Sequence, residues 1–313
     1  MFQLCLSFFQ LFGLYPVHVE RHKSALMNGC LTVIYFIWSI VHLLICLAHL
    51  INVILNKETF FYEETAIGRI NDVIVYASLI TAHFSIVLET VIQRRYFVLF
   101  WDYYDKIQSL NKTKENKNWC SKFIIKISIY ICFTIIVESL VIINVNKDDQ
   151  WTHFWYASIF ANSMTRIRHI QHIFFIDVIF FNLLDVNQHM KNGVQWTKGL
   201  RNETSLGYRY LFDNIYRRKQ QFKNLIEMLI CVNRIFRWSQ LLNFSQNFIE
   251  VTSELYWIYA YAISPKFYYG LLKCLVIFNL NSININIIHR NFNCISTNYR
   301  HQYNVNAFSN KMH

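Results

Sequence analysis

Residues 24–56, SALMNGCLTVIYFIWSIVHLLICLAHLINVILN, contain no aspartate, glutamate, lysine or arginine. A run of about 18 or more such residues is long enough for a helix that crosses the hydrocarbon core of a bilayer. The run has no small-residue cleavage site and is longer than the apolar core of a signal peptide, so we expect it to be retained. This stretch indicates a membrane protein.

Further segments have the length and apolar character of membrane helices, although several contain charged residues. Few glycines (7) and prolines (2) in the whole chain disfavour a turn-rich β fold. We therefore expect an all-α, multi-pass membrane helical bundle of about six spans, forming a single domain over 1–313 with an atypical tail at 289–313. The predicted spans are 31–55, 73–93, 124–146, 153–180, 238–262 and 267–288.

Basic residues gather between these spans and predict the orientation of the chain. Segment 94–126 carries eight Lys/Arg against three acidic residues, and segment 185–237 carries ten against four. By the positive-inside tendency, 94–123 and 185–237 are cytoplasmic, and so is the N-terminus. The net charge of +11 follows from these loops and does not mark a nucleic-acid site, because the charges share no single soluble face.

The second cytoplasmic segment has a helical pattern of its own. Apolar residues between 206 and 236 recur near helical spacing. We expect an amphipathic helix there that runs directly into the span 238–262 and extends the bundle into a cytoplasmic anchor region.

Ionisable side chains inside spans are costly and usually face the interior of a bundle or a wet cavity. Such residues either pair across helices or line a polar cavity, and the sequence leaves both open. In 239–261 polar residues recur every three or four positions, so they share one helix face opposite an apolar face. The ionisable candidates are Glu89, Glu138, Arg166, Arg168, Asp177, Glu250 and Glu254.

Catalytic and metal-binding motifs find little support. The chain has no glycine-rich phosphate loop, no HExxH and no G-x-S-x-G. His169 and His172 lie three residues apart, and His18 and His22 four apart, but no further ligands at matching spacing accompany either pair. We expect no enzyme activity, no metal and no cofactor.

Two stretches resemble a known family. FRWSQLLNFSQNFIEVTSELYWIY (236–259) resembles the fifth helix of insect gustatory receptors, and SMTRIRHIQHIFFIDVIFFNLLDVNQHMK (163–191) resembles the fourth. The resemblance implies a tastant-gated cation channel in the plasma membrane of chemosensory neurons, formed by a homo- or hetero-tetramer of such subunits around small-molecule pockets. Insect odorant receptors share the architecture, but the Tyr-Trp-Ile-Tyr ending favours the taste branch.

The resemblance places a ligand pocket in the outer half of the bundle. The polar face of 239–261 then looks into this pocket or toward its packing neighbours, and aromatic residues near the outer ends of the spans supply walls or an interfacial belt. The pocket candidates are Trp155, Ser158, Asn162, Glu250, Ser253, Glu254, Trp257 and Tyr261.

The C-terminal part departs from the family pattern. After 267–288 the sequence shows no seventh apolar segment and no Thr-Tyr-hydrophobic-Gln-Phe pattern of a pore helix. We expect the chain as given to be C-terminally truncated and non-conducting by itself. The alternatives are a polytopic membrane enzyme or transporter that uses the intramembrane Glu, Arg and His residues, and a truncated gene product without further function.

Overall fold

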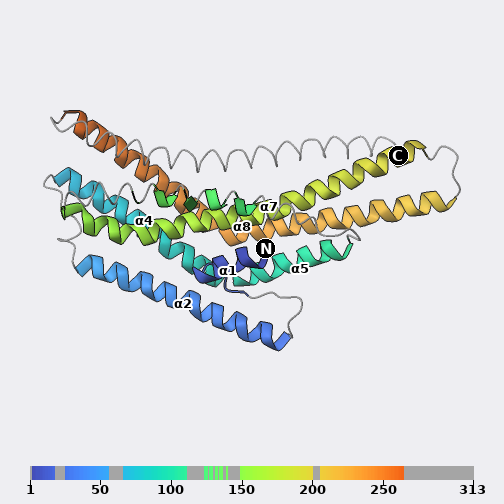
Figure 1. Ribbon diagram of the computed structural model, residues 1–313, viewed down its shortest axis with the longest axis horizontal. Coiled ribbons are helices and arrows are strands. Elements are labelled where there is room, and N and C mark those ends of the chain that lie inside the picture. Colours follow the sequence, from blue (N-terminus) through green and yellow to red (C-terminus); the bar gives the residue numbers. More distant parts are fainter. Residues whose placement is uncertain are drawn as a thin grey trace. The chain divides into compact units, whose positions relative to one another are not determined.

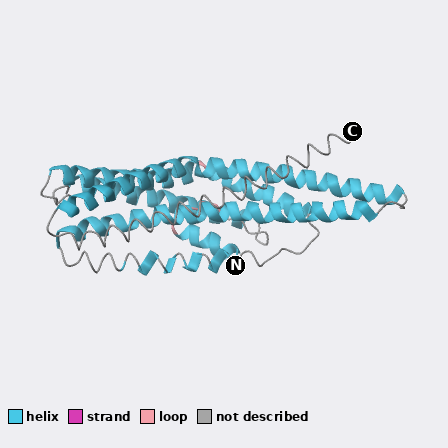
Figure 2. Ribbon diagram, turned by 90° about the horizontal axis from the view of Figure 1, so that it is seen from above, coloured by secondary structure: helices cyan, strands magenta, loops and turns pink. Residues whose placement is uncertain are grey.

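The computed structural model describes residues 2–17, 25–55, 66–110, 149–199 and 205–263, together with most of 123–136 and residue 139. Within these ranges every regular element is an α-helix (Figure 2). The predicted all-α fold is confirmed. The predicted span 267–288 and the tail 289–313 lie outside the described residues.

The described helices differ widely in length, and the two longest are α7 and α8 (Figure 1). α8 continues without a break from the predicted amphipathic segment into 238–262, as the periodicity predicted. In chain order the helices are α1 (Phe2–Leu11), α2 (Ala25–Leu55), α4 (Ala66–Ile92), α5 (Arg94–Leu110), α7 (Asp149–Gly199) and α8 (Ser205–Ile263).

Three of the described helices are long and apolar enough to cross a membrane. Their apolar parts are Gly29–Asn52 in α2, Ile67–Ile92 in α4 and Ser158–Asn192 in α7. A shorter apolar helix, Phe123–Ile136, covers the first part of the predicted third span. The segment 238–262 forms the end of α8, which is not among the three, so its insertion stays a prediction.

Helix α2 shows how these elements suit a lipid environment. Its side chains Val33, Ile37, Leu44, Ile51 and Leu55 are exposed although all are large and apolar. Their spacing of four and seven residues places them on one face of the helix. A face of this size would be unfavourable in water, and it fits contact with lipid tails.

Helix α4 packs against both α2 and α7. It ends at a turn where the amide of Gln93 donates to the carbonyl oxygen of Glu89 (2.8 Å), and α5 begins directly afterwards. Along α5, successive buried residues are one or three positions apart, so one face of this helix is buried and the other is exposed. The buried residues of α5 are Phe97, Phe100, Trp101, Tyr104 and Ile107.

The N-terminal segment is built into this core. The hydroxyl of Ser39 in α2 donates to the carbonyl oxygen of Gly13 (2.7 Å), and the indole of Trp38 donates to the carbonyl oxygen of Leu11 (3.0 Å). Tyr15 is buried with its ring edge-on to that of Phe97 in α5, and burial raises the pKa of its hydroxyl. The segment that follows α1 therefore joins α2 to α5.

Gly13 adopts a backbone conformation that side chains disfavour. Its φ is 68°, and a Cβ added there would lie 2.9 Å from Cδ2 of His42. We expect Gly13→Ala to lower the free energy of unfolding by about 1–2 kcal/mol, because a left-handed conformation carries that cost for a residue with a Cβ. Denaturation of both proteins in mixed micelles measures this difference in the free energy of unfolding.

Gly29 provides the matched control for this substitution. It lies within α2, and a Cβ added there would meet nothing within 4 Å. Gly29→Ala should be neutral or slightly stabilising, since alanine favours helix. Equal effects of the two substitutions would show that Gly13 is not required for the turn after α1.

The chain divides into two compact units, Met1–Gln246 and Asn247–His313. The first contains α1 to α7 and most of α8. The described part of the second is the end of α8, from Asn247 to Ile263.

Candidate functional site

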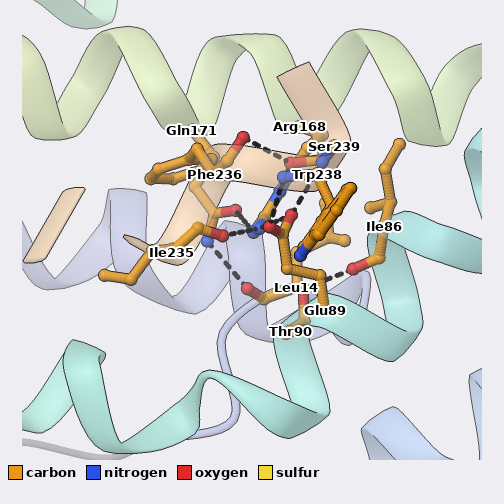
Figure 3. A network of polar contacts seen from close by, with 10 residues as sticks. All are labelled: Leu14, Ile86, Glu89, Thr90, Arg168, Gln171, Ile235, Phe236, Trp238 and Ser239. Atoms are coloured by element: carbon orange, nitrogen blue, oxygen red, sulfur yellow. Dashed lines mark hydrogen bonds and ion pairs between the residues drawn. The ribbon is translucent and has the colours of Figure 1, made fainter. Parts of the chain in front are cut away.

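A buried ion pair joins two of the membrane-span helices. Glu89 lies in the last turn of α4 and Arg168 lies within α7, and Nη2 of the arginine is 3.3 Å from Oε2 of the glutamate (Figure 3). The two side chains are 0% (Arg168) and 2% (Glu89) exposed. A charge buried to this extent requires a partner and further hydrogen bonds, because its removal from water costs several kcal/mol.

The guanidinium of Arg168 uses its remaining donors on α7 and α8. Nη1 donates to Oε1 of Gln171 (2.7 Å), Nη2 donates to the carbonyl oxygen of Ile235 (2.6 Å), and Nε donates to the hydroxyl of Ser239 (3.3 Å). The guanidinium also lies over the ring of Phe236, 4.2 Å from its centroid. The fork of donors on this side chain thus holds α7 against one turn of α8.

The carboxylate of Glu89 contacts the same turn of α8. It accepts hydrogen bonds from the backbone amides of Trp238 (2.7 Å) and Ser239 (2.9 Å). In an ideal helix the amide of Ser239 would bond to the carbonyl of Ile235, and here the ion pair bonds to both groups. Side chains that insert into a helical ladder in this way locate bends, so this turn is where α8 is expected to change direction.

The N-terminal segment also reaches this group. Gln171, which accepts from Arg168, donates through Nε2 to the carbonyl oxygen of Leu14 (2.8 Å). Glu89, Arg168, Gln171 and the turn 235–239 therefore form one polar network that connects α4, α7, α8 and the segment after α1 (Figure 3). We call this group the polar network.

A second polar group lies on α2, α4 and α7. The ring of Phe160 in α7 stacks on His42 of α2 (6.3 Å between centroids) and meets His83 of α4 edge-on (5.4 Å). Nδ1 of His83 lies 3.5 Å from Sγ of Cys46. Nε2 of His83 has no hydrogen-bond partner among the described residues, although this side chain is only 1% exposed. An unpartnered buried nitrogen beside an aromatic ring is able to bond to a small polar molecule.

The predicted pocket residues divide between the two units of the chain. Ser158 and Asn162 are buried one turn apart on the same face of α7, whereas Phe160, two residues from each, is on the other side of the helix and is exposed. In the second unit Ser253 is buried and Glu250 is partly buried on α8. The pocket itself stays a prediction. The side chains of Trp155, Glu254, Trp257 and Tyr261 lie outside the described part.

Of the ionisable residues expected inside spans, Glu89 and Arg168 pair with each other, which is the structural alternative considered for them. Glu138 lies outside the described residues. The sequence did not indicate which partners would meet, nor that Gln171 and the backbone of 235–239 complete the network. The signal available was the presence of charged residues inside apolar segments, which placed both residues among seven candidates but did not indicate their contact.

Metal binding has no support in the part of the chain that the structure describes. No group of three or more His, Cys, Asp or Glu residues there is arranged to hold a metal ion.

The comparisons with known proteins give one family. The family model described as 7tm Chemosensory receptor matches residues 2–310. No curated protein and no solved structure matches the chain.

Proposed function

The chain belongs to the 7tm chemosensory receptor family, which includes the insect gustatory and odorant receptors, and from this we propose that it is a gustatory receptor. In this proposal it is a subunit of a tastant-gated cation channel in the plasma membrane of chemosensory neurons. The observation that carries the proposal is the family match over nearly the whole chain. The resemblance of 236–259 to the fifth helix of gustatory receptors supports the taste branch over the odorant branch.

The mechanism we propose is a shift in population between closed and open bundles. A ligand that binds more tightly to the open arrangement raises its population according to the difference between the two affinities. The polar network suits the role of a fixed joint in such a bundle, because it ties α4, α7 and α8 at one turn. Movement of one helix would then be transmitted to the others.

We propose that the predicted residues of α7 and, independently of them, those of α8 contact the ligand. The burial of Ser158 and Asn162 supports this for α7, because it places two small polar groups together on one buried face of the helix. For α8 the support is the polar face that carries Glu250 and Trp257. Aromatic walls with a few polar groups suit small, partly apolar molecules.

Substitution of Glu250 or Trp257 by Ala is expected to change the ligand response more than the amount of receptor at the cell surface. We expect the half-maximal ligand concentration to rise about tenfold or more, since a lost anchor is worth about 1.4 kcal/mol or more. Calcium imaging measures the ligand response, and surface labelling measures the amount of receptor at the cell surface. The expressed cDNA is cloned from chemosensory tissue and extends to the end of the message.

Phe248→Ala is the control, because this side chain is 68% exposed on the opposite, apolar face of α8. It should leave the response unchanged. A parallel loss of response and surface expression in the Glu250 and Trp257 variants would make their role structural and would count against the pocket.

The same cells separate the other functions considered. A response to volatile compounds and none to tastants would favour an odorant receptor. Uptake of a labelled solute without ligand-evoked current would favour a transporter.

A further inference from the structure

Four exposed arginines lie where α4 and α5 meet and where α8 passes them. Arg94 and Arg95 open α5 directly after the turn at Gln93, and Arg234 and Arg237 lie on α8 beside the polar network. Positions 234 and 237 are three apart and share a helix face. In the predicted orientation all four lie at the cytoplasmic boundary of the membrane.

One contact joins Arg234 of α8 to the start of α5. Nη1 of Arg234 donates to the hydroxyl of Tyr96 (2.5 Å), and its guanidinium lies 5.0 Å from the centroid of that ring. Because Tyr96 follows Arg95 in sequence, this contact places Arg234 beside the start of α5. Glu89, four residues before Gln93, holds the amide of Trp238 and so fixes the next turn of α8 to the end of α4.

Aromatic rings also restrict the guanidinium groups of Arg237 and Arg94. Arg237 lies over the ring of Trp238 (5.3 Å to its centroid), and Arg94 lies over the ring of Phe36 in α2 (4.5 Å). A guanidinium held against a ring loses less side-chain freedom when it binds an anion than one that extends freely into solvent. These arginines are therefore partly prepared for a ligand.

The charge of this surface is not neutralised by the described residues. Glu89, the nearest carboxylate in the network, is buried and already bonded to Arg168 and to two amides of α8. None of the described carboxylates forms an ion pair with Arg94, Arg95, Arg234 or Arg237. Exposed apolar side chains border the arginines, including Trp238 at 52% exposure and Ile92. Clustered cations beside exposed apolar groups match the chemistry of a lipid headgroup region.

We propose that Arg94, Arg95, Arg234 and Arg237 form a binding surface for the phosphates of an anionic phospholipid headgroup in the cytoplasmic leaflet. The forked guanidinium matches phosphate oxygens in pairs, and four such groups suit a headgroup that carries several phosphates. A headgroup bound here would contact both α5 and α8. It would thereby stabilise the same packing of helices that the buried Glu89–Arg168 ion pair stabilises.

The competing explanation is that these arginines only orient the chain in the membrane. In that case their removal would weaken lipid binding no more than removal of the same charge elsewhere on α8. Arg217 and Lys219 provide that comparison, because both are exposed on the same helix. Arg217 lies 20 residues before Arg237, which is roughly 30 Å along the helix.

The experiment measures binding of fluorescent phosphatidylinositol 4,5-bisphosphate to the full chain in phosphatidylcholine nanodiscs. The double variant Arg234→Gln/Arg237→Gln is compared with Arg217→Gln/Lys219→Gln. We expect the first to weaken binding about tenfold or more, since each basic residue near the surface contributes an appreciable part of the attraction. The second should remain within about twofold of the unsubstituted chain.

Two further measurements keep the result interpretable. Arg234→Lys/Arg237→Lys keeps the charge but not the fork, and it should bind with intermediate strength. Thermal unfolding of each variant must match that of the unsubstituted chain. If Arg234→Gln/Arg237→Gln fails to fold, lipid binding by Arg234→Lys/Arg237→Lys tests the proposal instead. Binding by the lysine variant as strong as that of the unsubstituted chain overturns the proposed recognition of phosphate by forked guanidinium groups. Equal weakening by both glutamine variants, or no binding by the unsubstituted chain, also overturns the proposal. Tastant responses play no part in this readout, so it stands apart from the proposed receptor function.

Discussion

Glu89→Leu is expected to lower the free energy of unfolding by about 3–5 kcal/mol, because it leaves the charge of Arg168 buried without its partner. Arginine does not release its proton inside proteins, so this charge cannot be relieved by neutralisation. Arg168 is fully buried, and its bonds to Ile235, Ser239 and Gln171 do not replace the lost carboxylate. Titration with SDS in mixed micelles measures the free energy of unfolding.

The double variant Glu89→Leu/Arg168→Met tests the reason for this loss. It removes both charges and fills the space with apolar groups, and such replacements of buried pairs are often neutral. We therefore expect the double variant to be more stable than Glu89→Leu alone, which independent substitutions would not produce. Asp102→Leu, at an exposed position of α5, should change stability by no more than about 0.5 kcal/mol. Additive losses in the double variant would contradict the pairing.

Phe175→Ala is expected to lower the free energy of unfolding by about 3–5 kcal/mol, as the same substitution does at other fully buried phenylalanines. Phe175 lies on α7, and its ring is 4.7 Å from that of Phe100 in α5 and 5.7 Å from that of Phe236 in α8, between centroids. It also contacts Trp101. Removal of this ring would leave a cavity bordered by three helices. The cavity would persist, because other contacts hold these helices in place and they can close around it only in part. The same denaturation measurement applies.

Two controls accompany this substitution. Phe175→Leu keeps most of the volume and should cost less than half as much as Phe175→Ala. Phe248→Ala removes a ring that is 68% exposed and should have little effect. If Phe175→Ala and Phe248→Ala cost the same, the ring of Phe175 would not be part of a close-packed core.

The polar network and the aromatic cluster meet at Phe236. Its ring packs against Phe175 and lies under the guanidinium of Arg168. The two predictions therefore concern neighbouring parts of one joint, and combining Glu89→Leu with Phe175→Ala is expected to give a non-additive loss. This joint is the feature through which a change in α7 would reach α8.

Much of the fold followed from local pattern. The uncharged run 24–56 is sufficient to predict a membrane helix, and the structure contains the apolar helix Gly29–Asn52 within it. The spacing of apolar residues between 206 and 236 predicted a helix, and α8 covers that range. These predictions depend only on length and periodicity, which each segment carries by itself.

The N-terminal segment shows where local pattern ends. Residues 2–17 contain no membrane-length run, and the sequence assigned them no position beyond the cytoplasmic side. In the structure Leu14 is buried and its carbonyl accepts from Gln171, 157 residues further along the chain. No periodicity within 2–17 encodes that contact, because it depends on the place where α7 presents an amide donor.

The sequence by itself determined that this chain is helical, that it is apolar enough for a membrane, and which charged residues inside its helices required an explanation. Only the tertiary structure decided that Glu89 and Arg168 form an ion pair and that both bond to the backbone of 235–239. The physical reason is that the cost of a buried charge is a property of one residue, whereas its compensation is a property of the groups that the fold brings within about 3 Å of it.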